Sequence, residues 1–454
     1  MNLNFDLERF IREKVTKRER SLLADDFARY DAELHARLDG RRVLVIGGAG
    51  SIGSHYIKAL LGFDVTKLVV VDISENGLTE LVRDLRSAGN YRIPKEFITY
   101  PVNFGDRVFE KLFKAHGPFD IVANFAAHKH VRSEKDIFSV EAMIENNVLR
   151  ARGLLDLLVT CPPQHFFCVS TDKAANPVNI MGASKKLMEE LIMAYADRLP
   201  IKTARFANVA FSNGSLPLGF LDRLFKRQPW SCPRGIKRFF VSPLESGELC
   251  LMASVMGESG DIVFPKLDEQ RDMIPFDQVA VDLLHALGME PDVCGSEEEA
   301  REKMAQIVGS RQSAIGNGAG RTNGEISRKG AKTQRCPNRE VGAESDATDS
   351  SFILQPSSLT KWPVYFFDSD TSGEKPYEEF HTAGEELDLE KFVNLGVVKN
   401  AKRRPPAEID SIFASLQKLF TSADVTKADV VHALKDYLPN FAHIETGKGL
   451  DQKM

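Results

Sequence analysis

The sequence is poor in cysteine and lacks any uninterrupted apolar segment long enough to cross a membrane. Its 454 residues include six cysteines, none of them in CxxC spacing, which favours free thiols over a disulfide framework or a cysteine metal site. Charges run through the first 20 residues and argue against a signal peptide, and no window approaches the roughly 20 apolar residues of a membrane span. We therefore expect a cytoplasmic protein without a membrane span.

An excess of charge of one sign is also missing. Lysine and arginine total 59 against 64 aspartates and glutamates, so no protein-wide field draws the chain to nucleic acid. With 43% hydrophobic and 27% charged residues, the composition is that of an ordinary globular protein with room for two or three domains. Ligands should therefore be held by local sites, and no nucleic-acid partner is expected.

Short apolar runs alternate with longer amphipathic stretches from residue 41 onward. The runs at 43–46, 68–71, 121–123 and 166–169 are typical of strands buried on both faces, and the segments between them have helical period. This alternation predicts an α/β fold with a doubly wound, parallel sheet.

The chain divides into four predicted parts. Residues 309–339 are rich in Gly, Ser, Asn, Lys and Arg, and such a stretch cannot bury enough apolar surface to fold. The alternative is a basic patch that binds nucleic acid, but the stretch has no interleaved aromatic residues. Beyond it we predict a strand at 362–367, a helix from 409 to 420, and a last helix through Leu438 that opens at a capping box of Thr426 and Asp429. The parts are 1–40, a helical segment; 41–290, the alternating α/β part; 291–361, a variable, largely disordered insertion; and 362–454, a C-terminal segment with helices.

A glycine-rich loop follows the first predicted strand and opens a helix. Glycines at 47, 50 and 53 permit a tight turn and close approach to a pyrophosphate, with Ser51 and Ile52 at the start of the helix. Asp72 ends the second strand, where the dinucleotide fingerprint needs an acid for a ribose hydroxyl. Because this carboxylate would repel a 2′-phosphate, NAD is favoured over NADP. The alternative is that the glycines only shape a turn.

Reactive side chains follow another predicted strand. Ser170, Thr171, Asp172 and Lys173 come directly after the run at 166–169, and Lys185 lies in the next helix. Strand ends at the carboxyl edge of such a sheet face the ligand crevice, so these groups can meet a substrate there. Asp172 and Lys173 alone could equally be caps or an ion pair. His128 and His130 lack accompanying carboxylates, and no metal site is expected.

Several further stretches complete a pattern that resembles the extended short-chain dehydrogenase/reductase superfamily. Within it, the chain is similar to the nucleotide-sugar 4,6-dehydratases of the polysaccharide-biosynthesis type. The likeness covers residues 41 to about 290 and about 362 to 400. Besides the glycine loop and the Ser-Thr-Asp-Lys run, it rests on residues 126–131 (AAHKHV), 181–185 (MGASK), 205–209 (RFANV), 238–241 (RFFV) and 373–380 (GEKPYEEF).

The resemblance implies a doubly wound parallel Rossmann sheet with a smaller C-terminal substrate-binding lobe. Residues 41–290 would be the NAD-binding Rossmann domain with parts of the substrate lobe, and 362–454 would add a substrate-lobe segment and helices. The implied reaction is an oxidation at sugar C4 by NAD⁺, loss of water across C5 and C6, and return of the hydride to C6. By position, Asp172 would protonate the departing C6 hydroxyl and Lys173 would take the C5 proton. These roles require a raised carboxyl pKa and a lowered ammonium pKa. Lys185 would hold the nicotinamide ribose, and Thr171, with Ser170 second, would bond the C4 oxygen.

The resemblance also assigns binding residues and shows departures from the pattern. Met181 stands where most superfamily members have a tyrosine, and it marks the subfamily. Because the tyrosine is missing, the group that takes the proton of the C4 hydroxyl stays open. Asn103 replaces an aspartate that usually contacts adenine, and Asn213 stands where an arginine is frequent. The implied binding residues are Ala126 for the cofactor, Asn208 and Arg238 for the nucleotide diphosphate, and Lys129 for sugar or cofactor.

The leading hypothesis is therefore a 4,6-dehydratase acting on UDP- or GDP-N-acetylglucosamine for surface glycans. The alternatives are a nucleotide-sugar 4-epimerase and a non-catalytic NAD-binding scaffold. An epimerase would require the tyrosine and has little use for an adjacent Asp-Lys pair. We also expect a homo-oligomer, with the N-terminal helices as the place to look for its contacts.

Overall fold

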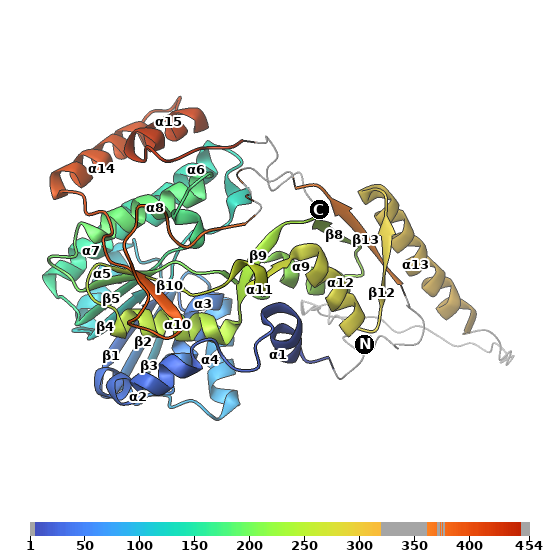
Figure 1. Ribbon diagram of the computed structural model, residues 1–454, viewed down its shortest axis with the longest axis horizontal. Coiled ribbons are helices and arrows are strands. Elements are labelled where there is room, and N and C mark those ends of the chain that lie inside the picture. Colours follow the sequence, from blue (N-terminus) through green and yellow to red (C-terminus); the bar gives the residue numbers. More distant parts are fainter. Residues whose placement is uncertain (1–4, 319–360, 370–372, 374, 376, 446–454) are drawn as a thin grey trace, which may run out of the picture. The chain divides into compact units, whose positions relative to one another are not determined.

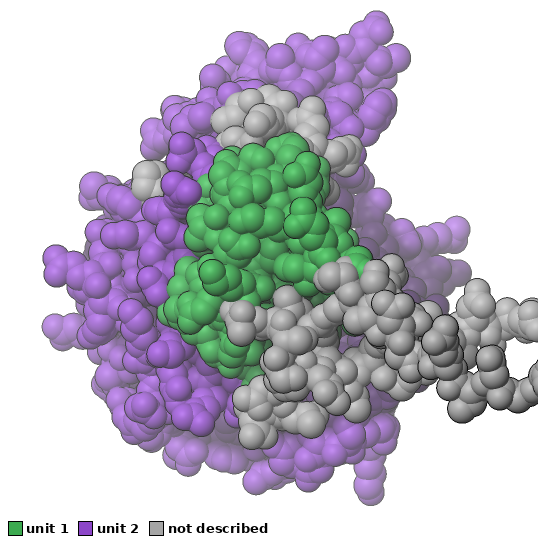
Figure 2. Space-filling model, turned by 90° about the vertical axis from the view of Figure 1, so that its right-hand side faces the viewer, with its two compact units in different colours: residues 1–5, 222–231, 281–366 green, residues 6–221, 232–280, 367–454 purple. Residues whose placement is uncertain are grey.

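The computed structural model describes residues 5–318, 361–369, 373, 375 and 377–445. They form two compact units, coloured separately in Figure 2. Unit 1 comprises residues 1–5, 222–231 and 281–366, and unit 2 comprises 6–221, 232–280 and 367–454, in each case as far as they are described. Residues 319–360, most of the predicted insertion, lie outside the described residues.

Unit 2 is built on a sheet of nine strands. Seven are parallel, and two antiparallel strands from the C-terminal part extend one edge. The α/β fold with a parallel, doubly wound sheet is thereby confirmed. In sheet order the strands are β14 (Leu387–Asp388), β15 (Leu395–Val398), β10 (Asp261–Pro265), β6 (Ile201–Ala204), β5 (His165–Val169), β4 (Ile121–Asn124), β1 (Arg42–Ile46), β2 (Lys67–Asp72) and β3 (Glu96–Pro101).

The central strands are apolar throughout because helices cover both faces. Val45, for example, pairs with Val70 of β2 and Ala123 of β4, and all three are fully buried. Figure 1 shows α6, α7 and α8 on one side of the sheet and α2, α3 and α10 on the other, with α14 and α15 outside α8. The helices of this unit that cover or flank the sheet are α3 (Ser51–Leu60), α4 (Glu75–Ala88), α5 (Arg107–His116), α6 (Ile137–Ile144), α7 (Arg150–Thr160), α8 (Ile180–Met193), α10 (Pro243–Met256), α14 (Pro406–Phe420) and α15 (Lys427–Tyr437).

Shorter elements complete the connections. The predicted capping box at Thr426 and Asp429 is present at the start of α15. A second, three-stranded sheet has the order β11 (Met273–Pro275), β9 (Lys237–Val241) and β7 (Asn208–Val209). The remaining short elements are η2 (Val131–Ser133), η3 (Glu145–Leu149), η4 (Asp172–Ala174) and α11 (Glu269–Asp272); α9 (Leu216–Phe225) and α12 (Phe276–Ala286) run across the unit boundaries in the sequence.

The strand order indicates the edge of the sheet at which a ligand is expected. From β1 the chain proceeds to β2 and β3 on one side, whereas β4, β5 and β6 lie on the other. Loops after β1 and β4 therefore diverge at the carboxyl edge, which is where open α/β sheets bind ligands. The glycine loop follows β1, and the Ser-Thr-Asp-Lys run follows β5 at the same edge.

Unit 1 contains a small sheet and a long helix. Its strands have the order β12 (Glu290–Cys294), β13 (Lys361–Phe367) and β8 (Trp230–Pro233), and the rings of Trp230 and Trp362 lie 6.5 Å apart. Helix α13 (Glu297–Gly318) occupies a range that the composition assigned to the insertion. Three glutamates in its first turn complement the helix dipole, and Ala300 and Met304 are buried, which explains a helix there.

The N-terminal segment packs on its own chain. It forms α1 (Leu7–Phe10), η1 (Ile11–Thr16) and α2 (Ala24–Leu38). Arg18 donates to both oxygens of Glu245 at 2.8 and 2.7 Å, and buried Asp26 accepts from the amides of Val393 and Asn394. In the described part of the chain, no helix has both the length and the apolar character needed to cross a membrane.

Candidate active site

The loop after β1 leaves no room for side chains at two of its glycines. Gly47 has a φ of +75°, and a Cβ there would lie 2.6 Å from the amide nitrogen of Ala126, just after β4. A Cβ on Gly53 would lie 2.3 Å from the Gly47 carbonyl oxygen. Gly50 is the N-cap of α3, so the first amides of this helix lie beside the loop. Such amides have no intrahelical partners and favour a phosphate group.

The first residues of α3 have different surroundings. The Ser51 hydroxyl accepts a hydrogen bond from the Asn213 amide at 2.8 Å, whereas Ile52 packs against the core. The Lys129 ammonium donates to the Asn213 carbonyl at 2.9 Å. The segment at Asn213 therefore joins the loop after β1 to the loop after β4, a connection that the sequence did not indicate.

Two polar side chains hold the neighbouring loops. Asp72, at the end of β2, accepts from the Ala49 amide at 3.0 Å and from the Ser74 amide at 2.9 Å, so its carboxylate braces the glycine loop. Asn103 follows β3 and accepts from the Gly105 amide at 2.9 Å. The structure thus places the predicted cofactor residues of β1, β2, β3 and β4 at one edge of the sheet.

A charged cluster follows β5. The Asp172 carboxylate accepts from the Thr171 hydroxyl at 2.7 Å and from the Lys173 ammonium at 3.1 Å. Glu378, which sequence reasoning did not single out, lies with Oε1 3.6 Å from the same ammonium. Burial lowers the pKa of Lys173, but the charges of Asp172 and Glu378 outweigh it and raise the pKa above its ordinary value. Lys173 is therefore held charged here, the reverse of what its expected role as a base requires.

Helix α8 begins beside this cluster. The Asn179 side chain caps it by accepting from the Gly182 amide at 2.8 Å. A buried carboxylate, Glu134, accepts from the amides of Ile180 and Met181 at 3.0 and 2.7 Å, and its burial raises its pKa to about 7. Glu134 was missed because no local pattern links it to α8. Met181 itself is 3% exposed.

The Lys185 side chain points to the strand rather than to a surface. Its ammonium donates to the Val169 carbonyl at 2.6 Å, and burial lowers its pKa. Lys185 lies one helical turn after Met181 and beside the end of β5, and its role at the nicotinamide ribose stays a prediction.

Two of the predicted substrate residues lie on adjacent strands of the small sheet. Asn208 of β7 pairs with Phe240 of β9, next to Arg238. The Asn208 Nδ2 is buried and has no hydrogen-bond acceptor among the residues described. Arg238 is 4% exposed, and its guanidinium donates to the Lys375 carbonyl at 3.0 Å. A buried amide that lacks an acceptor and a buried cation suit an anionic ligand.

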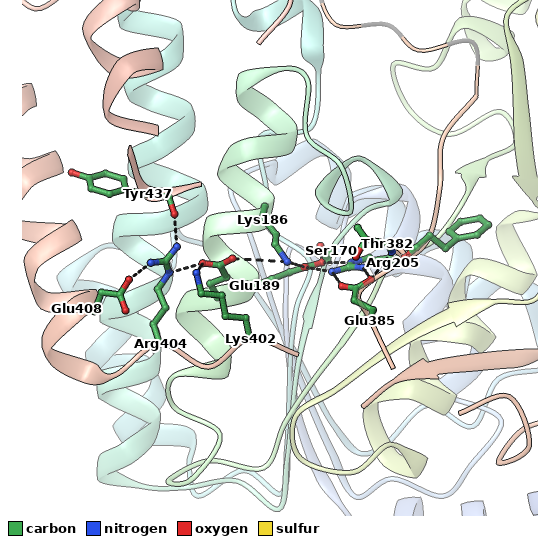
Figure 3. Close-up of polar contacts among 12 residues, drawn as sticks. Ser170, Lys186, Glu189, Arg205, Thr382, Glu385, Lys402, Arg404, Glu408 and Tyr437 are labelled. Carbon is green, nitrogen blue, oxygen red and sulfur yellow. Dashed lines mark hydrogen bonds and ion pairs between the residues drawn. The ribbon is translucent and has the colours of Figure 1, made fainter. Parts of the chain in front are cut away.

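Behind the site, a buried ion network joins α8 to the C-terminal segment (Figure 3). Arg205 is fully buried and donates to both carboxylate oxygens of Glu189 on α8, at 2.9 and 2.8 Å, and to both of Glu385, each at 2.9 Å. The Ser170 hydroxyl donates to Glu189 at 2.6 Å. Ser170, the second candidate for the C4 oxygen, is therefore engaged in this network in the present structure.

A family model and several curated relatives match the chain. The model of the family described as "Polysaccharide biosynthesis protein" matches residues 43–313. An uncharacterized membrane protein of Methanocaldococcus jannaschii is 32% identical over 56% of this chain and 74% of its own length. A probable polysaccharide biosynthesis protein of Bacillus subtilis, EpsC, is 27% identical over 57% of this chain, and the match spans only 42% of that protein. A UDP-glucose 4-epimerase of Rickettsia bellii is 30% identical over 50% of this chain and 66% of its own.

Among solved structures, Pen from Bacillus thuringiensis superposes with a TM-score of 0.56 at 17% identity, over 81% of this chain and 91% of the other. At this identity the likeness concerns the fold alone.

Proposed function

The chain belongs to the polysaccharide biosynthesis protein family, and we propose that it is a nucleotide-sugar 4,6-dehydratase acting on UDP- or GDP-N-acetylglucosamine with bound NAD. The single observation that carries the proposal is the contact between Asp172 and Lys173 at the carboxyl end of β5, 3.1 Å apart and beside the start of α8. Oxidation alone needs no such pair, whereas an elimination of water needs both an acid and a base.

The glycine loop fits a dinucleotide. The absent Cβ atoms at Gly47 and Gly53 leave the backbone open to close approach, and the start of α3 supplies amides for a pyrophosphate. Asp72 lies against the loop with carboxylate oxygens suited to ribose hydroxyls, which supports NAD over NADP. Bound there, NAD supplies reversible hydride acceptance.

The chain's own side chains supply the rest of the chemistry. Asp172 donates a proton to the departing C6 hydroxyl, and Lys173 takes the C5 proton, which a ketone at C4 makes acidic. Thr171 lies next to Asp172 and hydrogen-bonds the C4 oxygen. Lys185 orients the nicotinamide ribose, and Asn208 and Arg238 hold the diphosphate of the substrate.

A nucleotide-sugar 4-epimerase is the second candidate, because a relative of 30% identity is named as one. Met181, a buried thioether at the start of α8, speaks against it, because it cannot accept the proton of a sugar hydroxyl. A non-catalytic NAD-binding scaffold is the third possibility.

One assay separates the three. The purified chain is incubated with UDP- and GDP-N-acetylglucosamine, and the products are analysed by mass spectrometry. A 4-keto product lighter by one water supports the dehydratase, an isomer of unchanged mass supports the epimerase, and no turnover supports the scaffold.

The Lys173→Ala variant tests the base. We expect dehydration to fall by about 10²- to 10⁴-fold with NAD still bound, since the lysine lies outside the glycine loop. Lys114→Ala, at an exposed lysine on α5, is the control and should retain full activity. Near-normal turnover by Lys173→Ala would refute the assignment of the base.

A further inference from the structure

Lys173 lies between two carboxyl groups that come from distant parts of the chain. Its ammonium is 3.1 Å from Asp172 Oδ1 and 3.6 Å from Glu378 Oε1. The side chains of Asp172 and Glu378 are 4% and 3% exposed, so water does little to screen either contact. The other charges that act on this group are those of Arg238, on β9, and Lys375, in the same segment as Glu378.

This arrangement poses a chemical difficulty for the proposed dehydratase. An amine can remove the C5 proton only after it has lost its own, yet two carboxylates hold Lys173 protonated. The Lys173 side chain is 17% exposed and its ammonium lies within 4 Å of both carboxyl groups, so the nearest acceptor for its proton is one of these two groups.

The two carboxyl groups differ in how well they can accept the Lys173 proton. Asp172 Oδ1 already accepts three hydrogen bonds, from the Thr171 hydroxyl, the Lys173 amide and the Lys173 ammonium, and Asp172 is the group assigned to protonate the departing C6 hydroxyl. Burial has the largest effect on the pKa of Glu378 and raises it, although the positive charge of Lys173 opposes the shift. Glu378 is thus the better proton acceptor of the two.

Glu378 is also held in place from both sides. Before it, the Gly373 carbonyl accepts from the Asn179 side chain, the N-cap of α8, at 3.2 Å. After it, the Phe380 carbonyl accepts from Arg205 at 3.1 Å. Anchors on both sides fix the distance to Lys173, as proton transfer requires.

We propose that Glu378 is the proton partner of Lys173, a positioning residue that accepts the ammonium proton so that the amine can act as the base. The inference rests on the proposed dehydratase function. In the first transfer, an Nζ–H bond of Lys173 breaks and an O–H bond forms on Glu378, which converts an ion pair into a neutral pair. In the second, the C5–H bond breaks, the proton joins Lys173 Nζ, and the electron pair enters the enolate of the C4 ketone. The proton returns to C5 when the sugar is reduced, and Glu378 then returns its own proton to the amine.

The test compares kcat, KM and pH profiles of the full-length chain for the wild type, Glu378→Gln and Glu378→Asp, with UDP- or GDP-N-acetylglucosamine as substrate. Glu379→Gln is the matched control: its side chain is exposed and accepts from Asn176 instead. Far-UV circular dichroism checks the fold of each variant. Deuterium incorporation at C5 of the product in heavy water follows the proton step itself.

We expect a flat wild-type profile between about pH 6 and about pH 9, because the proton stays within the pair. Glu378→Gln must release the Lys173 proton to solvent, so its kcat should fall about 10- to 100-fold near neutrality and rise about tenfold per pH unit, with KM nearly unchanged. Deuterium incorporation should slow in parallel. Glu378→Asp, which keeps a carboxyl group, should lose kcat but keep the flat profile, and it serves as the test if Glu378→Gln does not fold.

A lower kcat in Glu378→Gln with the wild-type profile would show a merely structural role and overturn the inference. A steep pH profile in Glu378→Asp would overturn it as well. Either result leaves the dehydratase function standing, whereas a wild-type chain that turns over none of these sugars would refute that function itself.

Discussion

Replacing Arg205 with leucine should destabilise unit 2 strongly. The guanidinium makes four hydrogen bonds to Glu189 and Glu385 and a fifth to the Phe380 carbonyl, and Arg205 itself has no solvent exposure. Its removal leaves the buried carboxylate of Glu189 without its main partner, and breaking a buried ion pair from one side costs about 3–5 kcal/mol. Arg403→Leu is the matched control, because Arg403 pairs with Asp197 at the surface and such pairs contribute about 0–1 kcal/mol.

Urea unfolding followed by far-UV circular dichroism measures the difference. Tryptophan fluorescence would not serve, since both tryptophans, Trp230 and Trp362, lie in unit 1. A loss below about 1 kcal/mol in Arg205→Leu, equal to that of the control, would refute the reasoning.

The difference in free energy of unfolding between the wild type and Arg205→Leu should also become smaller at acid pH. In the wild type, burial raises the pKa of Glu189, but Arg205 outweighs it and holds the pKa below its ordinary value. The stabilisation is thus present above the unfolded pKa of about 4.3 and is lost as the pH falls through the lower folded value. Without Arg205, burial raises the pKa, so the variant loses stability as the pH rises above about 4.3. The two proteins should therefore converge as the pH falls from about 7 toward about 4.

Two further predictions concern the glycine loop and the N-terminal segment. Gly47→Ala should abolish NAD binding, measured by calorimetry, because its Cβ would lie 2.6 Å from the Ala126 amide nitrogen at a φ of +75°. The control, Gly153→Ala, lies in α7 with open space around it and should bind NAD normally. Retained NAD binding by Gly47→Ala would contradict the steric argument. Glu248 accepts a hydrogen bond from the Ser21 hydroxyl, and burial raises its pKa to about 7. The contribution of this carboxyl group to folding stability is therefore complete below the unfolded pKa of about 4.3 and is lost as the pH rises to about 7. Glu248→Gln should therefore gain urea stability relative to the wild type at about pH 8 but not at about pH 4, and equal shifts at both would count against a raised pKa.

Much of the fold was predictable because its signals are local. The apolar runs became β1, β2, β4 and β5, and the capping box at Thr426 opens α15. Helix α13 was not predicted, because residues 291–308 were assigned to one insertion together with the polar, small-residue stretch 309–339, although Ala300 and Met304 are buried. The glycine loop was predictable for the same reason as the strands: its residues are contiguous.

The site was only partly predictable. Asp172, Lys173, Met181 and Lys185 come from one stretch, and their common edge follows from the strand that precedes them. Glu134 accepts a hydrogen bond from the amide of Met181, 47 residues further along the chain, and no periodicity in the sequence predicts such a contact. The charge state of Lys173 was expected in the wrong direction, because the sequence shows the neighbouring Asp172 but not the second carboxylate.

By itself, the sequence determined the parallel α/β sheet, the glycine loop and the placement of an acid and an amine after β5, since periodicity, glycine spacing and strand ends act over a few residues. Only the tertiary structure decided that Glu378 flanks Lys173, and that Arg205 fastens α8 to a segment 180 residues further along the chain. Burial gives those distant charges their strength, and burial exists only once the chain has folded.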